Sequence, residues 1–496
     1  MPKRRAHPLF QLLPNKGHNA LLHGNARRHT ALSPMLILHS SDWHLGNRLM
    51  DHNRLDEFRA FFDWLLELMS ERRPDVLLIS GDVFDSSTPG DRAQGLLYDF
   101  LSRADATGCR RIILTAGNHD SAAQLSKAAP LLPRYHATVV ASLNRDDLLA
   151  CRLPLCDEGG TRRATLYAVP FLRPADVALP VSPDDPRELR ETAYTRGIAE
   201  VYAALARDAR EQKKLYGGAA IAMGHLSVLG TEMTASTRCL IGTLESVGRD
   251  IFEPVFDYVA LGHIHKPAAP EEGRIHYCGS PLAMGLDEAS YRHRLLWITV
   301  DDDGGVEVEA EPVPVFTLAE QVELADRQGF EALAEQLRRR AREANADCRR
   351  GSDIVPSHRV LLRYSGGDLT QSELLERAEA LREAAGLELV LARRCSAETA
   401  EADAEDELKL SLAELTPEEV LRRRMEETAG TAPPDPERQE RLLELFRSCL
   451  HELEAQRSSR REAKQRPASA ATAASAASAD LPESPESPVS GLSSDT

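Results

Sequence analysis

The sequence predicts an α/β protein built on two sheets, followed by a small α+β unit and a pair of C-terminal helices. Three observations support this fold class. Short apolar runs alternate with amphipathic helical patterns between residues 35 and 142, which is typical of βαβ units. Later strand patterns, up to residue 311, have few helices between them and indicate a second, more antiparallel sheet packed on the first. Beyond residue 316, helices and strands alternate on a smaller scale.

The first part of the chain carries the clearest periodicity. Leu55, Phe58 and Phe62 belong to an apolar set with steps of three and four residues, which predicts an amphipathic helix over residues 53–70. A strand starts just before it, at Leu36. The elements expected after this helix are strands at 75–80, 111–116 and 137–142 and helices at 91–105 and 121–132.

The rest of the chain falls into three sets of elements. For the second sheet we expect strands at 164–169, 219–223, 257–261, 274–278, 294–300 and 306–311, with a helix at 186–213. For the small unit we expect helices at 319–344 and 370–384 and strands at 359–364 and 387–393. Thr416 and Glu419 form a capping box around Pro417 and start the first C-terminal helix, and the second begins near residue 435. These two helices either bury their apolar faces against each other or offer them to a partner helix.

Composition and charge limit the possible functions. The 496 residues carry a formal net charge of −17, and residues 1–34 contain six Lys or Arg and no acid, which leaves −23 for residues 35–456. A nucleic acid would not be held by bulk electrostatics, so metal ions or a second subunit would have to supply the attraction. The eight cysteines form no Cys-x-x-Cys pair, which argues against a zinc knuckle or a disulfide framework. Without a long apolar run or a signal-like segment, we expect a cytoplasmic protein with no membrane contact.

The two ends of the chain lack structural patterns. Residues 1–34 are basic and aperiodic, and they are a disordered extension, a nucleic-acid-binding arm, or a segment upstream of a true start at Met35. The tail is rich in Ser, Ala and Pro, a composition typical of disorder. The expected divisions are an extension (1–34), a catalytic domain (35–315), a second domain (316–395), a linker with partner-binding helices (396–456) and a tail (457–496).

Polar side chains follow five of the apolar strands, at the point where each strand ends. Because the carboxyl ends of parallel strands meet at one edge of a sheet, we expect these side chains to lie close together. Asp42 and His44 also share a face, since strand side chains alternate. The five motifs are Asp42-x-His44, Gly81-Asp82-x-x-Asp85, Gly117-Asn118-His119-Asp120, Gly224-His225 and Gly262-His263-x-His265.

Seven residues of these motifs provide oxygen or imidazole donors and no thiolate: Asp42, His44, Asp82, Asn118, His225, His263 and His265. This mixture suits manganese, iron or zinc. Seven ligands are too many for one tetrahedral ion. With one bridging carboxylate they fit two ions about 4 Å apart, the spacing that phosphoesterases use to activate water and hold a phosphate. Asp82 is the expected bridge.

The remaining polar residues of the motifs have expected supporting roles. If Asn118 binds metal, the neighbouring His119 faces the substrate, where it could protonate the leaving oxygen or steady developing charge. Asp120 would hold the other nitrogen of that ring. Asp85 either orients a ligand or a metal-bound water, or it caps the following helix. His39, His136, His276 and His293 have no second ligand at metal spacing, and we expect no catalytic role for them.

The five motifs in this order resemble the calcineurin-like metallophosphoesterase superfamily. More narrowly, the chain resembles the SbcD family, the nuclease subunits of SbcCD complexes. The resemblance extends from residue 35 to about 453, includes the stretch at 415–421 with its trailing arginines, and leaves out both ends. It is carried most clearly by residues 41–46, 80–85, 260–265 and 277–281.

The resemblance implies a two-sheet metallophosphoesterase sandwich flanked by helices, with residues 316–395 as a capping domain that touches DNA. It implies two divalent ions, manganese with magnesium as the alternative. Asp42, His44, Asp82 and His265 would hold one ion, Asp82, Asn118, His225 and His263 the other, and His119 would act on the substrate.

The reaction implied is phosphodiester hydrolysis: ATP-dependent double-strand exonuclease and single-strand or hairpin endonuclease activity in DNA repair, recombination and replication. The partner would be an SbcC-like coiled-coil ATPase, bound through residues about 417–453, in a hetero-oligomer with pairing through the nuclease domain left open. The metal motifs alone would equally permit a phosphodiesterase or phosphatase that acts on small molecules. The second domain and the C-terminal helices favour the nuclease, because a small phosphatase does not need them.

Overall fold

The computed structural model describes part of the chain. The described residues are 34–394, except 51, 181, 183–185, 187–188, 190–191, 232–245, 272, 347 and 349–352. The predicted N-terminal extension, the partner-binding helices and the tail therefore lie outside the described residues. Among the described helices, none is both long and apolar enough to cross a membrane.

The first sheet has six strands in the order β14-β13-β1-β4-β5-β6. Its parallel half contains β1 (Met35–Ser40), β4 (Val76–Ser80), β5 (Arg111–Thr115) and β6 (Ala137–Val140). The antiparallel strands β13 (Arg294–Val300) and β14 (Val306–Pro312) complete it next to β1. We expected β13 and β14 in the second sheet, but β13 pairs with β1 and returns the chain to the sheet that it started from.

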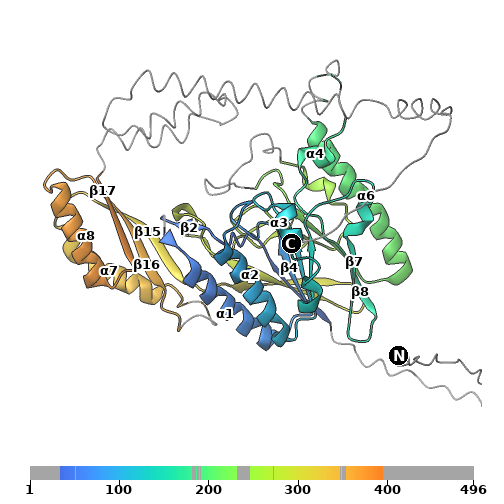
Figure 1. Ribbon diagram of the computed structural model, residues 1–496, viewed down its shortest axis with the longest axis horizontal. Helices are drawn as coiled ribbons and strands as arrows, with labels where there is room; N and C mark the ends of the chain where they lie inside the picture. Colours follow the sequence, from blue (N-terminus) through green and yellow to red (C-terminus); the bar gives the residue numbers. More distant parts are fainter. Residues whose placement is uncertain are drawn as a thin grey trace, which may run out of the picture. The chain divides into compact units, whose positions relative to one another are not determined.

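Two helices cover the outer face of this sheet. They are α1 (Leu55–Arg72) and α2 (Asp91–Ala104), which lie side by side in Figure 1. Their apolar stripes meet at Trp43, whose ring makes edge-to-face contacts with Phe62 and Phe100 at centroid distances of 5.0 and 5.2 Å. Trp43 is fully buried and lies between the two metal-type residues of the first motif, so packing of its ring fixes the backbone of that motif.

The second sheet has the order β11-β12-β10-β9-β8-β7. Its strands are β7 (Arg152–Cys156), β8 (Arg162–Tyr167), β9 (Ala219–His225), β10 (Tyr258–Gly262), β11 (Ala268–Glu271) and β12 (Ile275–Tyr277). Helix α6 (Ala193–Tyr216) covers its outer face, on the opposite side of the molecule from α1 and α2 (Figure 1). The expectation of a more antiparallel sheet is wrong, because β8, β9, β10 and β12 run parallel and only the edge strands are antiparallel.

The inner faces of the two sheets pack directly on each other. Ile37, Leu78 and Ile113 of the first sheet and Met223 and Ala260 of the second are fully buried in one shared core. Helices, sheet, sheet and helix therefore form four layers. Because the two parallel sets are stacked, the strand ends that carry the polar motifs belong to two sheets, and not to one sheet edge as expected.

A three-stranded sheet with its own core follows, drawn in orange at one end of Figure 1. Its strands are β15 (Thr317–Leu324), β16 (Ser357–Tyr364) and β17 (Leu389–Arg394), joined by α7 (Gly329–Glu343) and α8 (Gln371–Ala385). The strands are parallel, so the unit predicted as α+β alternates strand and helix. The helix predicted over residues 319–344 is wrong in its first third, where alternating burial marks β15. Helix α8 begins at the Thr370 and Glu373 capping box and ends at Gly386 in the left-handed conformation.

The described chain also contains shorter elements. The two-residue strands β2 (Arg48–Leu49) and β3 (His52–Asn53) form a small hairpin, and the buried Arg359 of β16 contacts the carbonyl oxygens of Leu49 and Asn53. The other short elements are α3 (Ala122–Ser126), α4 (Pro174–Val177) and the 3-10 turns at Asp105–Thr107, Leu132–Tyr135, Leu148–Cys151, Arg249–Ile251 and Leu286–Glu288. The helix predicted over residues 121–132 is thus much shorter than expected.

Candidate metal centre

All seven predicted ligands come together at one end of the two-sheet sandwich. From the first sheet, Asp42, Asp82 and Asn118 follow β1, β4 and β5. From the second sheet, His225 ends β9 and His263 follows β10. Each strand is a buried apolar run, which stops where the polar residue begins, so the end of the apolar core and the start of the site coincide.

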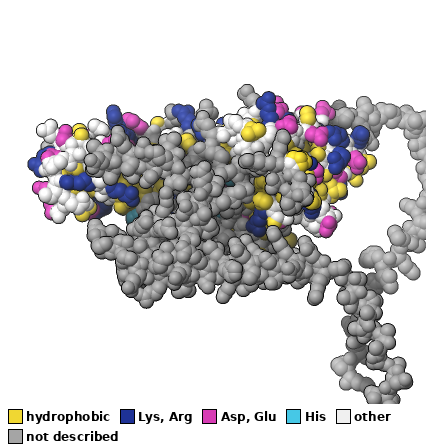
Figure 2. All heavy atoms as spheres, turned by 90° about the horizontal axis from the view of Figure 1, so that it is seen from above, with side chains coloured by type: hydrophobic (Ala, Val, Ile, Leu, Met, Phe, Trp, Pro, Cys, Tyr) yellow, Lys and Arg dark blue, Asp and Glu magenta, His cyan; other side chains and the backbone are white. Residues whose placement is uncertain are grey.

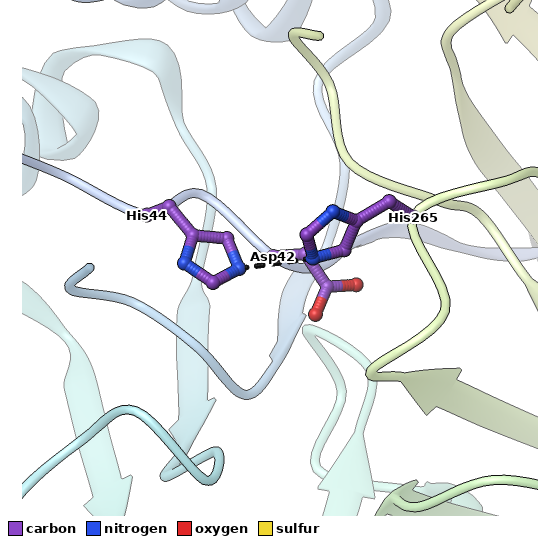
Figure 3. Close-up of side chains that lie close together, drawn as sticks. All are labelled: Asp42, His44 and His265. Carbon is purple, nitrogen blue, oxygen red and sulfur yellow. Dashed lines mark hydrogen bonds between the residues drawn. The ribbon is translucent and has the colours of Figure 1, made fainter. Parts of the chain in front are cut away.

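One group of donors consists of Asp42, His44 and His265, whose ligand-type atoms all lie within 4.8 Å of one another. The Nε2 atoms of His44 and His265 are 3.1 Å apart. Figure 3 shows the imidazoles of His44 and His265 facing each other, with the Asp42 carboxylate beside them. All three side chains are buried.

A second group is centred on the amide oxygen of Asn118. His225 Nε2 lies 2.8 Å from this oxygen, and His263 Nδ1 lies 2.9 Å from it. The Asp82 carboxylate lies between the two groups: its Oδ2 is 3.5 Å from His44 Nε2 and 3.2 Å from His225 Nε2. Asp82 is therefore placed where a bridging carboxylate would be.

The imidazole rings are turned so that lone pairs converge. His44 Nδ1 faces Asp85 Oδ1 at 3.4 Å, His265 Nδ1 faces Glu288 Oε1 at 2.7 Å, and His225 Nδ1 faces the Ser80 carbonyl oxygen at 3.0 Å. These partners accept hydrogen bonds, which favours a proton on each Nδ1 and directs each Nε2 toward the other donors of the site. On His225 the Asp82 carboxylate favours a second proton at Nε2, and a metal ion would have to displace it. Acceptors about 3 Å apart repel unless a cation lies among them, and neighbouring ligands of an octahedral ion with bonds of about 2.1 Å have this spacing. The residues thus fit divalent metal ions.

The backbone at the site is strained. Asp42, His44, Asp82 and His263 all have positive φ, at 52°, 46°, 45° and 92°. Residues other than glycine rarely adopt this conformation, and each such residue costs about 1–3 kcal/mol. All four are candidate metal ligands that lie close together. Strain concentrated at these residues indicates that the surrounding fold keeps their side chains in positions that the site requires.

The motif glycines allow neighbouring segments to approach closely. At Gly117 a Cβ would lie 2.2 Å from the Asp82 carboxylate, and at Gly262 it would lie 1.9 Å from the Ser80 carbonyl oxygen. No side chain fits at either position. The glycine before Asn118 is thus needed beside a candidate ligand of the same sheet, and the glycine before His263 is needed where the backbone of the other sheet approaches.

The electrostatic field of the site attracts positive charge. Burial opposes protonation of His225, but the Asp82 carboxylate outweighs it and raises the pKa of His225 to about 9. Burial and the neighbouring His225 lower the pKa of His263 to about 3, so this ring is neutral, as a metal ligand must be. Although burial opposes it, the surrounding histidines, His225 first, keep the pKa of Asp82 well below its usual value.

The predicted supporting residues are all at the site, with one change of role. His119 Nδ1 is 2.9 Å from the Asp85 carbonyl oxygen, and its ring makes an edge-to-face contact with that of His44. The prediction that Asp120 holds the His119 ring is wrong. The buried Asp120 carboxylate accepts three backbone N–H bonds of 2.8–3.0 Å, from Gly117, Val83 and Phe84, and so ties two motif loops together.

Asp85 had two predicted roles, and the structure favours one of them. Its carboxylate faces His44 Nδ1 and accepts a hydrogen bond from Asn47. The alternative, a cap on the following helix, is wrong, because α2 starts at Asp91 after Gly90 and has no side-chain cap.

Sequence reasoning missed two polar residues. Glu288 is fully buried and holds His265, and Ser41 donates a hydrogen bond of 2.6 Å to Asp42 Oδ2. Glu288 lies 23 residues after its partner in a turn, and no motif marks it. Ser41 directly precedes Asp42, and a hydroxyl next to a candidate ligand was the sequence signal that could have indicated its supporting role.

The histidines expected to have no catalytic role lie away from the ligands. His39 is buried between the sheets, where it contacts Tyr258 Oη at 2.9 Å and Ser80 Oγ at 3.2 Å. His276 stacks on Tyr258, and the exposed His136 pairs with Asp105. His293 Nδ1 faces the Ser280 carbonyl oxygen at 2.7 Å.

Comparison with known proteins supports the same chemistry. Residues 35–267 match the family model of the calcineurin-like phosphoesterases. The chain is 33% identical to the SbcD subunit of the SbcCD nuclease of Escherichia coli strain K12 over 426 residues, which cover 84% of this chain and 98% of that protein. This chain belongs to the SbcD family. The corresponding protein of Rhodobacter capsulatus is 36% identical over 288 residues, covering 56% of this chain and 69% of that protein.

Membership of the SbcD family makes the chain a metal-dependent hydrolase that acts on phosphodiester bonds, and its phosphoesterase domain implies divalent metal ions. Solved structures give a weaker match. A dimetal phosphatase from Danio rerio has a TM-score of 0.34 and 10% identity, and TT1561 of Thermus thermophilus has a TM-score of 0.31 and 10% identity. Each match covers 56% of this chain and 99% of the other, and at these scores neither carries an argument.

Proposed function

We propose that this chain is the DNA-cleaving subunit of an SbcCD-type assembly and that it works with two manganese ions. Asp42, His44 and His265 would hold one ion, and Asn118, His225 and His263 would hold the other. Asp82 lies between the two groups and would contribute to both sites. Such an ion pair polarises the scissile phosphate and supplies a hydroxide-like nucleophile at neutral pH.

The observation that carries the proposal is the convergence of acceptor atoms around Asp82. Imidazole nitrogens, an amide oxygen and carboxylate oxygens face one another in a buried space at 2.8–3.5 Å. The donors are oxygens and imidazoles, without a thiolate, which suits manganese better than a soft metal. Magnesium is the alternative ion, although four histidines favour a metal that accepts nitrogen.

His119 is the residue proposed to act on the substrate. Its Nδ1 donates to the Asp85 carbonyl oxygen, which fixes the ring and leaves Nε2 as the atom that exchanges a proton with the substrate. The His119 backbone N–H donates to Asp82 Oδ1 at 2.8 Å, so the position of the ring is set by the proposed bridging residue. In this role His119 protonates the leaving oxygen of the cleaved phosphodiester.

The proposed substrate is DNA, cleaved as duplex ends, single strands and hairpins. A chain with a net charge of −17 will not gather DNA by bulk attraction. Where side chains of the described residues are visible in Figure 2, basic and acidic ones lie next to one another. The ions and a partner subunit would supply the missing attraction, in the cytoplasm where we expect the protein to work.

The proposed partner is an SbcC-like coiled-coil ATPase, bound through residues about 417–453. The sequence supports this by its helix start at Thr416 and Pro417 and by the apolar Leu443 and Phe446, which lie outside the described residues. Deleting residues after about 408 should abolish co-elution with the ATPase and leave manganese-dependent cleavage of single strands. The double replacement Leu443→Asp and Phe446→Asp should have the same effect, because a charge in an apolar interface is costly to desolvate.

One assay tests the main proposal. Purified full-length chain, with and without the ATPase, is given duplex, hairpin and single-stranded DNA and a small phosphodiester, in manganese or in EDTA. We expect manganese-dependent cleavage of single strands and hairpins and ATP-stimulated cleavage of duplex ends only with the partner. Turnover of the small diester without cleavage of any DNA would favour the alternative, a phosphodiesterase or phosphatase for small molecules.

A further inference from the structure

A cavity of about 470 Å³ lies between the first sheet and the small three-stranded unit. Its walls come from the segment that leads into β13, from β14 and the residues after it, from the start of β15 and from the end of α7. Its volume is within the range of small-molecule sites, about 300–1,000 Å³. The metal centre as described above does not include it.

The charge of this cavity differs from that of the chain as a whole. Arg292 and Arg294 line it, and no Asp or Glu is among the described residues of its wall. Arg292 is exposed and has no carboxylate partner among the described residues. In a chain with a net charge of −17, a cavity with two arginines and no acid is selective for an anion.

Two buried polar atoms of the cavity wall are left without partners by the described residues. His293 Nδ1 faces an acceptor, the Ser280 carbonyl oxygen at 2.7 Å, so Nδ1 carries the proton and Nε2 is an acceptor. Within the described part of the chain, neither His293 Nε2 nor Arg294 Nε has a hydrogen-bond partner. Both atoms have almost no exposed surface, so a ligand in the cavity would meet the rest of the lining, which consists mainly of arginine and apolar side chains.

The opposite wall is apolar. Val313, Val315 and Leu318 line it, and Tyr291 adds an aromatic ring at the rim. A flat apolar group such as a nucleobase would bury against such a wall. The cavity thus combines two arginines that recognise an anion with an apolar surface, and together these match the phosphate and base of a nucleotide.

The cavity is one loop away from the candidate metal centre. His293 binds the Ser280 carbonyl oxygen, and the Ser280 backbone N–H donates to the His265 carbonyl oxygen at 3.1 Å. Lys266, which follows His265, lies over the Tyr291 ring at 5.9 Å. A strand that passes the metal centre along this loop would reach the cavity with a neighbouring nucleotide.

We propose that this cavity binds a nucleotide, with its phosphate on Arg292 and Arg294 and its base against Val315 and Leu318. The inference rests on the proposed function and extends it to the substrate outside the cleaved bond. The same chemistry could come from a nucleotide within the DNA strand or from a free nucleoside monophosphate, such as a digestion product.

The test measures binding of a labelled single-stranded oligonucleotide to the full chain in EDTA, so that no cleavage occurs, together with calorimetric titration of dAMP. The variant is Arg292→Ala, and the matched control is Arg59→Ala, an exposed arginine of α1. We expect Arg292→Ala to weaken oligonucleotide binding roughly tenfold and to reduce the slope of log affinity against log salt by about one, the mark of a lost phosphate contact. Arg59→Ala should change neither.

A second variant, Leu318→Trp, fills the cavity and leaves both arginines in place. It should weaken binding by a similar factor without the same change in salt slope. If dAMP binds to the wild type and Arg292→Ala abolishes this, free nucleotides use the cavity, whereas an effect on the oligonucleotide alone assigns it to the DNA strand.

The inference is overturned if Arg292→Ala behaves like Arg59→Ala toward both ligands while all variants keep the wild-type melting temperature. Failure of the proposed function would look different. The wild type itself would then show no manganese-dependent cleavage of DNA, which is measured separately and does not depend on these variants.

Discussion

Replacement of Glu288 by Gln tests how the fold prepares one metal ligand. Glu288 Oε1 accepts from His265 Nδ1 at 2.7 Å, and Oε2 accepts from the Met284 backbone N–H at 2.8 Å. Glutamine keeps the shape but offers one acceptor and a donor. One of the two partners, both donors, must then face an NH₂ group in a fully buried position.

The magnitude follows from the position of Glu288 behind a proposed ligand. Loss of the carboxylate that holds a metal-bound imidazole typically weakens metal binding by roughly 10–100-fold, or about 1.4–2.8 kcal/mol. We expect a loss of affinity of this size for the ion proposed to bind His265, and little change in affinity for the ion on the Asn118 side. The mismatched buried donor should also lower the free energy of unfolding by about 1–3 kcal/mol.

The assay is calorimetric titration of the metal-free protein with manganese, together with urea denaturation in EDTA. Glu311→Gln provides a matched control, because Glu311 is a buried carboxylate of β14 that accepts from Trp297 Nε1 at 3.0 Å, away from the site. It should lower stability and leave both metal affinities unchanged. Equal affinity for manganese in Glu288→Gln and wild type, or an equal loss at both ions, would refute the reasoning.

Four further substitutions test other parts of the molecule. Asp82→Asn should lower the affinity for both ions in calorimetric titration, because the carboxylate lies between the two donor groups. His44→Ala should lower chiefly the affinity for one ion. Loss of the same single ion in both variants would contradict the bridging role of Asp82. His119→Gln should keep both ions and DNA binding but lower kcat roughly 10²–10⁴-fold in a cleavage assay, and loss of a bound ion would instead make His119 a ligand. Burial, with the neighbouring His276, lowers the pKa of His39 to about 3, so the unfolded chain takes up its proton first as pH falls below about 6.5. This difference should lower the free energy of unfolding by about 2 kcal/mol between pH 6.5 and 5. In urea denaturation, the free energy of unfolding of His39→Gln should fall less over the same pH range. An equal fall would mean that the His39 ring is already protonated in the native state.

Much of the metal centre could be predicted because its ligands are encoded locally. Each candidate ligand lies at the end of an apolar strand or within four residues of it, and the strand end fixes where its backbone lies. A motif such as Gly-Asn-His-Asp carries both the small residue that permits close approach and the donor that uses the space. The structure brings all seven predicted ligands together, and the glycines beside them leave no room for a Cβ.

The roles of the supporting residues could not be predicted in the same way. Asp120 was expected to hold a neighbouring ring, but its carboxylate joins two loops whose backbone N–H groups come from residues 37 and 36 positions away. Glu288 contacts His265 from a turn in a separate part of the chain. Contacts of this kind depend on how loops meet after the sheets have packed, and a local pattern contains no record of that.

The sequence by itself indicated the family, the candidate ligands and the strands that carry them, because apolar runs and donor spacing are short-range properties of the chain. Only the tertiary structure decided that these strands divide between two sheets, that β13 closes the first sheet beside β1, and that Arg292 and His293 line a cavity beside the metal centre. The physical reason is that pairing of distant strands and burial of polar groups are set by packing of the whole chain. Residues hundreds of positions apart, such as Asp42 and His263, become neighbours only there.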